Sequence, residues 1–118
     1  MSINEFKDYD EYISLIKNTD YVKLLVFSKD NCSACKQSLI ESEKILKLFN
    51  NKRLIINKVV MHYDSQKNLT NSKIFDNYRI DFVPSYVLIY NNNFEKMKNP
   101  EIKYLIERIK CILDRFEK

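Results

Sequence analysis

Residues Val22–Leu48 read VKLLVFSKDNCSACKQSLIESEKILKL. The apolar run Leu24–Phe27 is typical of a buried strand, and a short polar segment connects it to two cysteines in a C-x-x-C spacing. Apolar residues at helical spacing follow, so we predict that Cys32 and Cys35 lie at the start of a helix. The N-terminus of a helix has unpaired backbone N–H groups and partial positive charge. Both favour a thiolate, the reactive form of cysteine, so the arrangement indicates redox chemistry.

Strand and helix patterns alternate on both sides of this stretch, and we expect residues 1–118 to form a single domain. The predicted strands are Ile3–Phe6, Val22–Ser28, Leu54–Met61, Tyr86–Tyr90 and Phe94–Lys98. The predicted helices are Asp8–Asn18 with a capping box from Asp8 and Glu11, Cys32–Phe49, a helix capped by Asp64-Ser65 that carries Leu69, Phe75 and Tyr78, and a last helix that starts at Asn99-Pro100. Pro100 is expected in the first turn of that helix, where a missing N–H costs nothing.

Two helices have apolar stripes that predict which side faces the core. In the helix after the cysteines the stripe is Cys35, Leu39, Ser42, Leu46 and Phe49, with Ile45 at its edge. In the last helix it is Ile102, Leu105, Ile106, Ile109, Ile112, Leu113 and Phe116. Cys111 lies nearly opposite this second stripe at 100° per residue, so we predict a thiol that is exposed or only partly covered.

Charge and hydropathy exclude several classes of protein. The net charge is +4, with Lys and Arg mixed among Asp and Glu, which is not the footprint of a nucleic-acid-binding protein. The longest apolar runs are only as long as a strand, so no membrane span is expected. The N-terminus has no basic segment followed by an apolar one, and we therefore expect a cytoplasmic protein. We also expect it to be a monomer. In that reducing compartment a C-x-x-C is more often catalytic or metal-binding than structural.

The chain contains no glycine. Backbone positions that need a left-handed conformation must then be occupied by the next most tolerant residue, asparagine. We expect Asn50-Asn51 and Asn91-Asn92-Asn93 to form the turns at which the sequence changes direction.

The order of elements, together with two local segments, resembles the thioredoxin family over the whole chain. One segment is a strand, then Cys32-Ser33-Ala34-Cys35-Lys36, then a helix; the other is Tyr78–Ser85, which is similar to the family's segment leading into its cis-proline. The resemblance implies an α/β, thioredoxin-like fold with a central mixed sheet of about five strands, flanked by helices on both faces.

The resemblance also implies a thiol–disulfide oxidoreductase that acts on protein disulfides. Cys32 would attack the substrate disulfide and Cys35 would resolve the mixed disulfide. Pro84 would be cis and would let the backbone of Val83 pair with an extended substrate. The expected substrate-binding residues are Asn31, Ser33, Ala34, Val83 and Pro84. No bound cofactor or metal is implied, and electrons would come from a thioredoxin-reductase-like donor or another dithiol protein.

Several residues depart from the family's pattern. Asn31 replaces a tryptophan, Ser33-Ala34 replaces Gly-Pro, and Ile40 replaces the proline that kinks the helix. Val26 lies in the strand that carries a buried acid in the family, so Lys58 would lack the acidic partner of its counterpart. These changes bear on proton transfer at Cys35, on redox potential and on the surface offered to partners.

Three alternatives remain. A zinc half-site would need two further ligands, and only His62 and Cys111 are available, in distant segments. A glutaredoxin-like enzyme is disfavoured because Asn92 and Asn93 stand where a Gly-Gly pair helps to hold glutathione. A non-catalytic module would bind a partner in the groove around Pro84. Lys29, Lys36, Lys58 and His62 are interpreted as surface residues, whereas Phe82 and Tyr86 are expected to touch a partner.

Overall fold

The computed structural model describes residues 3–63 and 68–116. Its helices are α1 (Tyr9–Lys17), α2 (Ser33–Leu48), α3 (Asn68–Asn77) and α4 (Ile102–Phe116), and its strands are β1 (Val22–Lys29), β2 (Leu54–Met61), β3 (Ser85–Tyr90) and β4 (Asn93–Lys98). The strands form one sheet in the order β2-β1-β3-β4. Strand β1 runs parallel to β2 and antiparallel to β3, and β3 and β4 are antiparallel, so the sheet is mixed as predicted.

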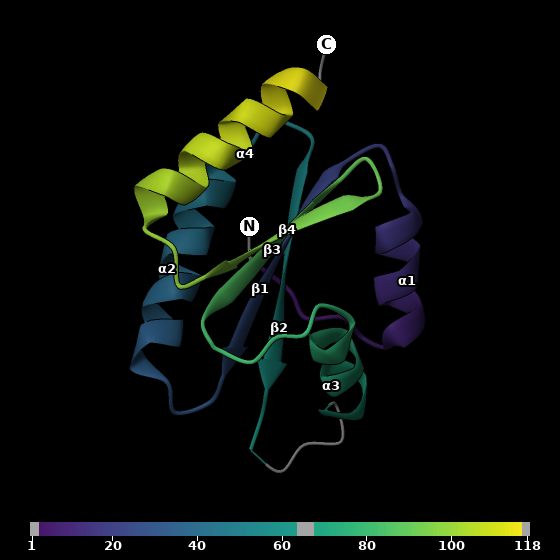
Figure 1. The fold of residues 1–118 in the computed structure, drawn as a ribbon, viewed down its shortest axis with the longest axis vertical. Coiled ribbons are helices and arrows are strands. Elements are labelled where there is room, and N and C mark those ends of the chain that lie inside the picture. The colour runs from purple at the N-terminus through teal and green to yellow at the C-terminus, as the bar shows by residue number, and fades with distance from the viewer. Residues whose placement is uncertain (1–2, 64–67, 117–118) are drawn as a thin grey trace.

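Helices cover both faces of the sheet, with α2 and α4 on one face and α1 and α3 on the other (Figure 1). Side chains alternate along β1, so that Leu24 and Val26 pack with Ile109 of α4 while Leu25 and Phe27 belong to the core on the opposite face. Because both faces are covered, Val22 to Ser28 are all buried. This explains the continuous apolar run that marks the strand in the sequence.

The N-cap predicted at Asp8 is confirmed, but the reciprocal bond of the capping box comes from the residue before it. Asp8 is the N-cap, and its Oδ1 accepts a hydrogen bond from the backbone N–H of Glu11 at 2.8 Å. The Glu11 carboxylate in turn accepts from the backbone N–H of Lys7 at 3.1 Å. Two otherwise unpaired donors are thereby satisfied.

Asparagine replaces glycine at the hairpin between β3 and β4. Asn91 and Asn92 have φ values of 47° and 62°, which gives the two left-handed residues that the tightest hairpin turn requires. Asn50 and Asn51 lie in the turn that follows α2, as predicted, but neither has a positive φ, so the left-handed conformation expected there is wrong. Helix α2 ends at a Phe49 C-cap whose N–H bonds to Ile45 O.

The strand predicted at Ile3–Phe6 is absent from the described residues, and the sheet has four strands rather than about five. Asn4 forms an isolated parallel bridge with Asn57 at the edge of β2. Asn4 O accepts from the backbone N–H of Lys58 and from Asn57 Nδ2, both at 3.1 Å. Among the described residues the segment thus forms one bridge to the sheet, while the side chains of Ile3 and Phe6 are buried in the two cores.

Three helical details differ from the prediction. Ile45 is fully buried at the centre of the α2 stripe, and Leu39 and Leu46 only flank it. Leu69 is 75% exposed, because the side of α3 that faces the core is set by Asn71 and Ile74. Pro100 precedes α4, whose first bond runs from Leu105 N to Glu101 O. The proposed Asp64-Ser65 cap lies outside the described residues.

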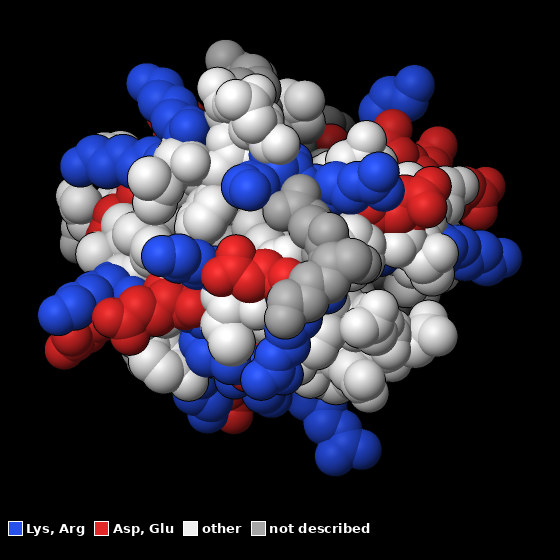
Figure 2. All heavy atoms as spheres, turned by 90° about the horizontal axis from the view of Figure 1, so that it is seen from above, with Lys and Arg blue, Asp and Glu red and all other residues white. Residues whose placement is uncertain are grey.

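The apolar stripe predicted for α4 is confirmed. Leu105, Ile109, Ile112 and Leu113 are buried against the sheet, and Cys111 is free and partly covered on another side of the helix. In the part of the chain that the structure describes, no helix is long and apolar enough to cross a membrane. Basic and acidic side chains are intermixed over the face shown in Figure 2, which therefore presents no large field of one sign.

Candidate active site at the Cys32–Cys35 disulfide

The two cysteines lie where β1 passes into α2. Asn31 takes a left-handed conformation with φ 58°, and Cys32 is the extended N-cap of the helix. The backbone N–H of Cys35 donates to Cys32 Sγ at 3.3 Å. The Cys32 sulfur therefore occupies the capping position, where N–H groups and the helix dipole favour negative charge.

Cys32 and Cys35 form a disulfide with a Cα–Cα separation of 5.2 Å. Their exposure differs: Cys32 is partly exposed, whereas Cys35 is only 2% exposed. An incoming thiolate can thus approach Cys32 while the sulfur of Cys35 stays covered. Ser33 and Ala34, between the two cysteines, are exposed at the rim of the site, as is Asn31.

Pro84 lies at the same end of the sheet. The Val83–Pro84 peptide bond is cis, in agreement with the resemblance. Phe27 pairs with Ser85 in the antiparallel register. Pro84, one residue before Ser85, therefore lies beside the end of β1 that leads to Cys32. Pro84 O accepts from the backbone N–H of Asn99 at 2.9 Å, which ties this segment to the end of β4.

An open groove of about 400 Å³ adjoins Val83. It is lined by Lys29, Met61, Phe75, Ile80, Asp81, Phe82 and Val83. Phe82 is 48% exposed and offers an apolar ring at the surface. The groove has a charge of each sign, from Lys29 and Asp81, on otherwise apolar walls.

Tyr86 was expected to touch a partner, and that expectation is wrong. Its side chain is only 4% exposed and points towards α2. The Tyr86 hydroxyl is 2.6 Å from Ser38 Oγ and donates to Ser38 O at 3.2 Å, while Ser42 Oγ donates to Ser38 O at 2.8 Å. Burial raises the pKa of Tyr86, so this hydroxyl keeps its proton.

These three residues form a buried hydroxyl cluster, Ser38–Ser42–Tyr86, under the first turns of α2. Ser38 lies one turn after Cys35 on the same buried side of the helix. Tyr86 is the register partner of Val26 on β1. The sequence shows the two serines as polar residues on the inward side of α2. Their partner Tyr86 lies on another element, 48 residues after Ser38 and 44 residues after Ser42.

Ser28 is a second buried hydroxyl close to the site. It is 1% exposed, on the same face of β1 as Leu24 and Val26, four residues before Cys32. Its Oγ has no hydrogen-bond partner within the described part of the chain. A buried hydroxyl of this kind remains able to donate to a new acceptor.

A charged cluster that the sequence did not reveal lies just before Cys32. His62 Nε2 is 2.9 Å from Glu5 Oε1, and His62 Nδ1 is 3.3 Å from the Asp30 carboxylate. The backbone N–H of Tyr63 also donates to Asp30 Oδ2 at 2.9 Å, and this bond is the main reason why the pKa of Asp30 is lowered. Asp30 and His62 follow two neighbouring parallel strands, whose carboxyl ends meet at one edge of the sheet.

Three lysines complete the set of candidates. Lys29 and Lys36 are exposed, and Lys58 is half-buried opposite Val26 on β2. Among the described residues no group of three or more His, Cys, Asp or Glu could hold a metal ion. The electrostatic contact to the disulfide that the structure gives is the start of α2, where the Cys35 N–H donates to Cys32 Sγ.

No protein-family model and no curated protein sequence matches the chain. Solved structures do. Thioredoxin from Trypanosoma brucei brucei matches with a TM-score of 0.77 and 16% identity over 97% of this chain and 92% of its own. Oxidised mitochondrial thioredoxin 3 from Saccharomyces cerevisiae matches with a TM-score of 0.73 and 18% identity, over 92% of this chain and 93% of its own. Oxidised thioredoxin O2 from Arabidopsis thaliana matches with a TM-score of 0.74 and 11% identity, over 94% of this chain and 93% of its own. The chain therefore has the thioredoxin fold, with its C-x-x-C disulfide at the start of α2.

Proposed function

We propose that the protein is a thiol–disulfide oxidoreductase that acts on protein disulfides through Cys32 and Cys35. The observation that carries the proposal is the asymmetric disulfide at the N-terminus of α2, with one approachable sulfur and one covered sulfur. The likeness to thioredoxin structures supports it.

The exchange proceeds in two steps. In the reduced protein the Cys32 thiolate attacks one sulfur of a substrate disulfide, which forms a mixed disulfide and expels the first substrate sulfur as a thiolate. Cys35 then loses its proton, attacks Cys32 Sγ and expels the second substrate thiolate. Two electrons have passed to the substrate and Cys32–Cys35 is oxidised, while the two substrate thiolates take up the proton released by Cys35 and one proton from solvent. An external dithiol donor restores the reduced form by the same steps in reverse.

The start of α2 assists the first step. The Cys35 N–H that now donates to Cys32 Sγ is placed to stabilise a thiolate on the same atom. In the second step the charge develops on a buried sulfur, so hydroxyl donors matter more. Ser38, one turn away, and Ser28, with its unused hydroxyl, are two of the buried polar groups on that side of the sheet.

Protein substrates fit the surface around the dithiol better than glutathione does. Asn31, Ser33 and Ala34 are exposed next to Cys32 in the chain and would contact the substrate, and the backbone of Val83 next to cis-Pro84 would pair with an extended chain. Phe82 and the adjoining groove add apolar area for a substrate side chain. We further propose that a thioredoxin-reductase-like protein supplies the electrons and that the protein works as a monomer in the cytoplasm.

Insulin reduction by dithiothreitol tests the proposal, with Cys32→Ser and Cys35→Ser as variants and Cys111→Ser as the matched control. We expect turnover by the wild type and by Cys111→Ser, and none by Cys32→Ser. Cys35→Ser should accumulate a mixed disulfide with the substrate, because the resolving thiol is gone. Equal, negligible rates for the wild type and Cys32→Ser would instead support a non-catalytic binding module that uses the groove around Pro84.

A further inference from the structure

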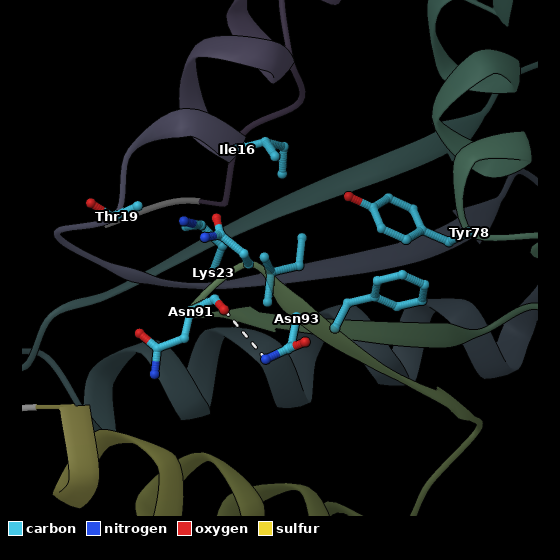
Figure 3. Close-up of a pocket in the computed structure, with 9 residues that line it drawn as sticks. Ile16, Thr19, Lys23, Tyr78, Asn91 and Asn93 are labelled. Carbon is cyan, nitrogen blue, oxygen red and sulfur yellow. Dashed lines mark hydrogen bonds between the residues drawn. The ribbon is translucent and has the colours of Figure 1, made fainter.

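A second cavity lies at the opposite end of β1 from the dithiol (Figure 3). It has a volume of about 180 Å³ and is bounded by the end of α1, the start of β1 and the β3–β4 hairpin. Its lining residues are Ile16, Thr19, Lys23, Tyr78, Ile89, Asn91, Asn92, Asn93 and Phe94. Lys23 and Lys29 are six residues apart in β1, so roughly 20 Å separates this cavity from the active-site end of the strand.

Lys23 is the unusual member of this set. It is the second residue of the central strand, and it is only 3% exposed. Its Nζ donates to Asn18 O, the C-cap carbonyl of α1, at 2.5 Å. An ammonium group has three donors, and Asn18 O is its hydrogen-bond acceptor among the described residues. Burial lowers the pKa of Lys23, because desolvation disfavours the charged form.

The surroundings of Lys23 lack an anion. Among the described residues that line the cavity, none is acidic. Ile16, Ile89 and the rings of Tyr78 and Phe94 supply apolar walls. The hairpin supplies amides, one of which, Asn93 Nδ2, donates to Asn91 O at 3.3 Å.

We propose that this cavity binds a small monocarboxylate with a compact apolar body. The carboxylate would accept hydrogen bonds from Lys23 Nζ, and the apolar part would lie between Ile16, Ile89 and Phe94. The size is suitable, because an apolar cavity of about 150 Å³ is enough for benzene. The anion supplies the counter-charge that the described lining residues do not, and a buried ammonium paired in this way is stabilised rather than penalised.

Linkage sets the pH dependence of this binding. A ligand that prefers the charged form of Lys23 must raise the pKa of that residue, and Lys23 must in turn bind the ligand best below its own pKa. The opposing hypothesis is that Lys23 only caps the last carbonyl of α1, in which case the cavity has no preference for an anion.

Benzoate and the neutral, similarly shaped benzamide are suitable probes, titrated into the oxidised full chain at pH 7 and followed by amide NMR. We expect saturable shifts at the amides of Thr19, Lys23 and Asn92 with benzoate, and a dissociation constant at least about tenfold weaker with benzamide. Lys23→Met should lose the benzoate response, whereas Lys103→Met, which removes an exposed lysine of α4, should keep it.

Equal affinity for the two probes, or no saturable shift at these amides, would overturn the proposal. So would an unchanged benzoate response in Lys23→Met. If that variant does not fold, a pH titration of the Lys23 Cε resonance in the wild type decides: benzoate must move the midpoint upwards, and an unmoved midpoint refutes the idea. The proposal is independent of the redox function, since Lys23→Met should reduce insulin as the wild type does.

Discussion

Replacing Tyr86 by phenylalanine removes one hydroxyl from the buried cluster with Ser38 and Ser42. The Tyr86 hydroxyl is 2.6 Å from Ser38 Oγ, and both side chains are almost fully buried. The ring is kept, so the loss is confined to the hydrogen bonds. A buried polar group deprived of its partner costs about 1–3 kcal/mol, and we expect Tyr86→Phe to lower the free energy of unfolding by that amount.

A double-mutant cycle separates the interaction energy of the Ser38–Tyr86 pair from the effects of the two single substitutions. Ser38→Ala alone leaves the Tyr86 hydroxyl with fewer partners, but combining it with Tyr86→Phe removes both polar groups at once. We therefore expect the double variant to lose less stability than the sum of the two single losses, by about 1 kcal/mol.

Urea unfolding of the oxidised proteins, followed by far-ultraviolet circular dichroism, measures these differences. Tyr104→Phe is the matched control, because Tyr104 is 50% exposed and the same atom is removed; its effect should stay within about 0.5 kcal/mol. Strictly additive losses, or a Tyr86→Phe variant as stable as this control, would refute the idea that the hydroxyls act as a unit.

Four further outcomes are expected. Arg108 binds the Glu95 carboxylate and lowers its pKa, so Glu95→Gln should cost roughly 0.5–1 kcal/mol at pH 7. A lowered folded-state pKa means that this stability is present above the unfolded-state pKa and is lost as the pH falls through the folded-state pKa. The cost should therefore be smaller in unfolding experiments near pH 3 than at pH 7, and an undiminished cost would contradict the ion pair. Asp8→Ala should destabilise α1 by about 0.5–2 kcal/mol in the same assay, and no change would mean that the cap contributes nothing. Because Ser33-Ala34 replaces a rigid Gly-Pro, we expect a reduction potential above about −270 mV, and equilibration with glutathione that gives a lower value would refute this. Cys111 should react with a maleimide in the native, oxidised protein; labelling only after denaturation would show that its thiol is not accessible.

Local sequence patterns predicted most of the helices and strands of the fold. The apolar run of β1 predicted a strand buried on both faces, and the boundaries predicted for β2, Leu54–Met61, are those of the structure. The stripe on α4 and the Asn91-Asn92 hairpin were equally readable. Each of these features depends on neighbours within a few residues, whose spacing or backbone preference is written directly in the chain.

The cysteine site was also readable in part. Two cysteines after a buried strand and before a helical pattern place their sulfurs at a helix N-terminus whatever the rest of the molecule does, because the helix dipole is a local property. The sequence therefore predicted the position of the dithiol and the difference in burial between Cys32 and Cys35, since helical spacing places the second cysteine on the inward side.

The partners of the buried polar side chains, near the dithiol and at the far end of β1, were decided only by tertiary structure. Ser38 obtains its partner from Tyr86, and His62 meets both Glu5 and Asp30 across 32 residues or more. Lys23 breaks the apolar pattern of β1, yet it is buried because the end of α1 and the hairpin cover it. Periodicity gives the face on which a side chain lies, but the identity of its partner depends on sheet register and on the packing of distant elements, which no local pattern contains.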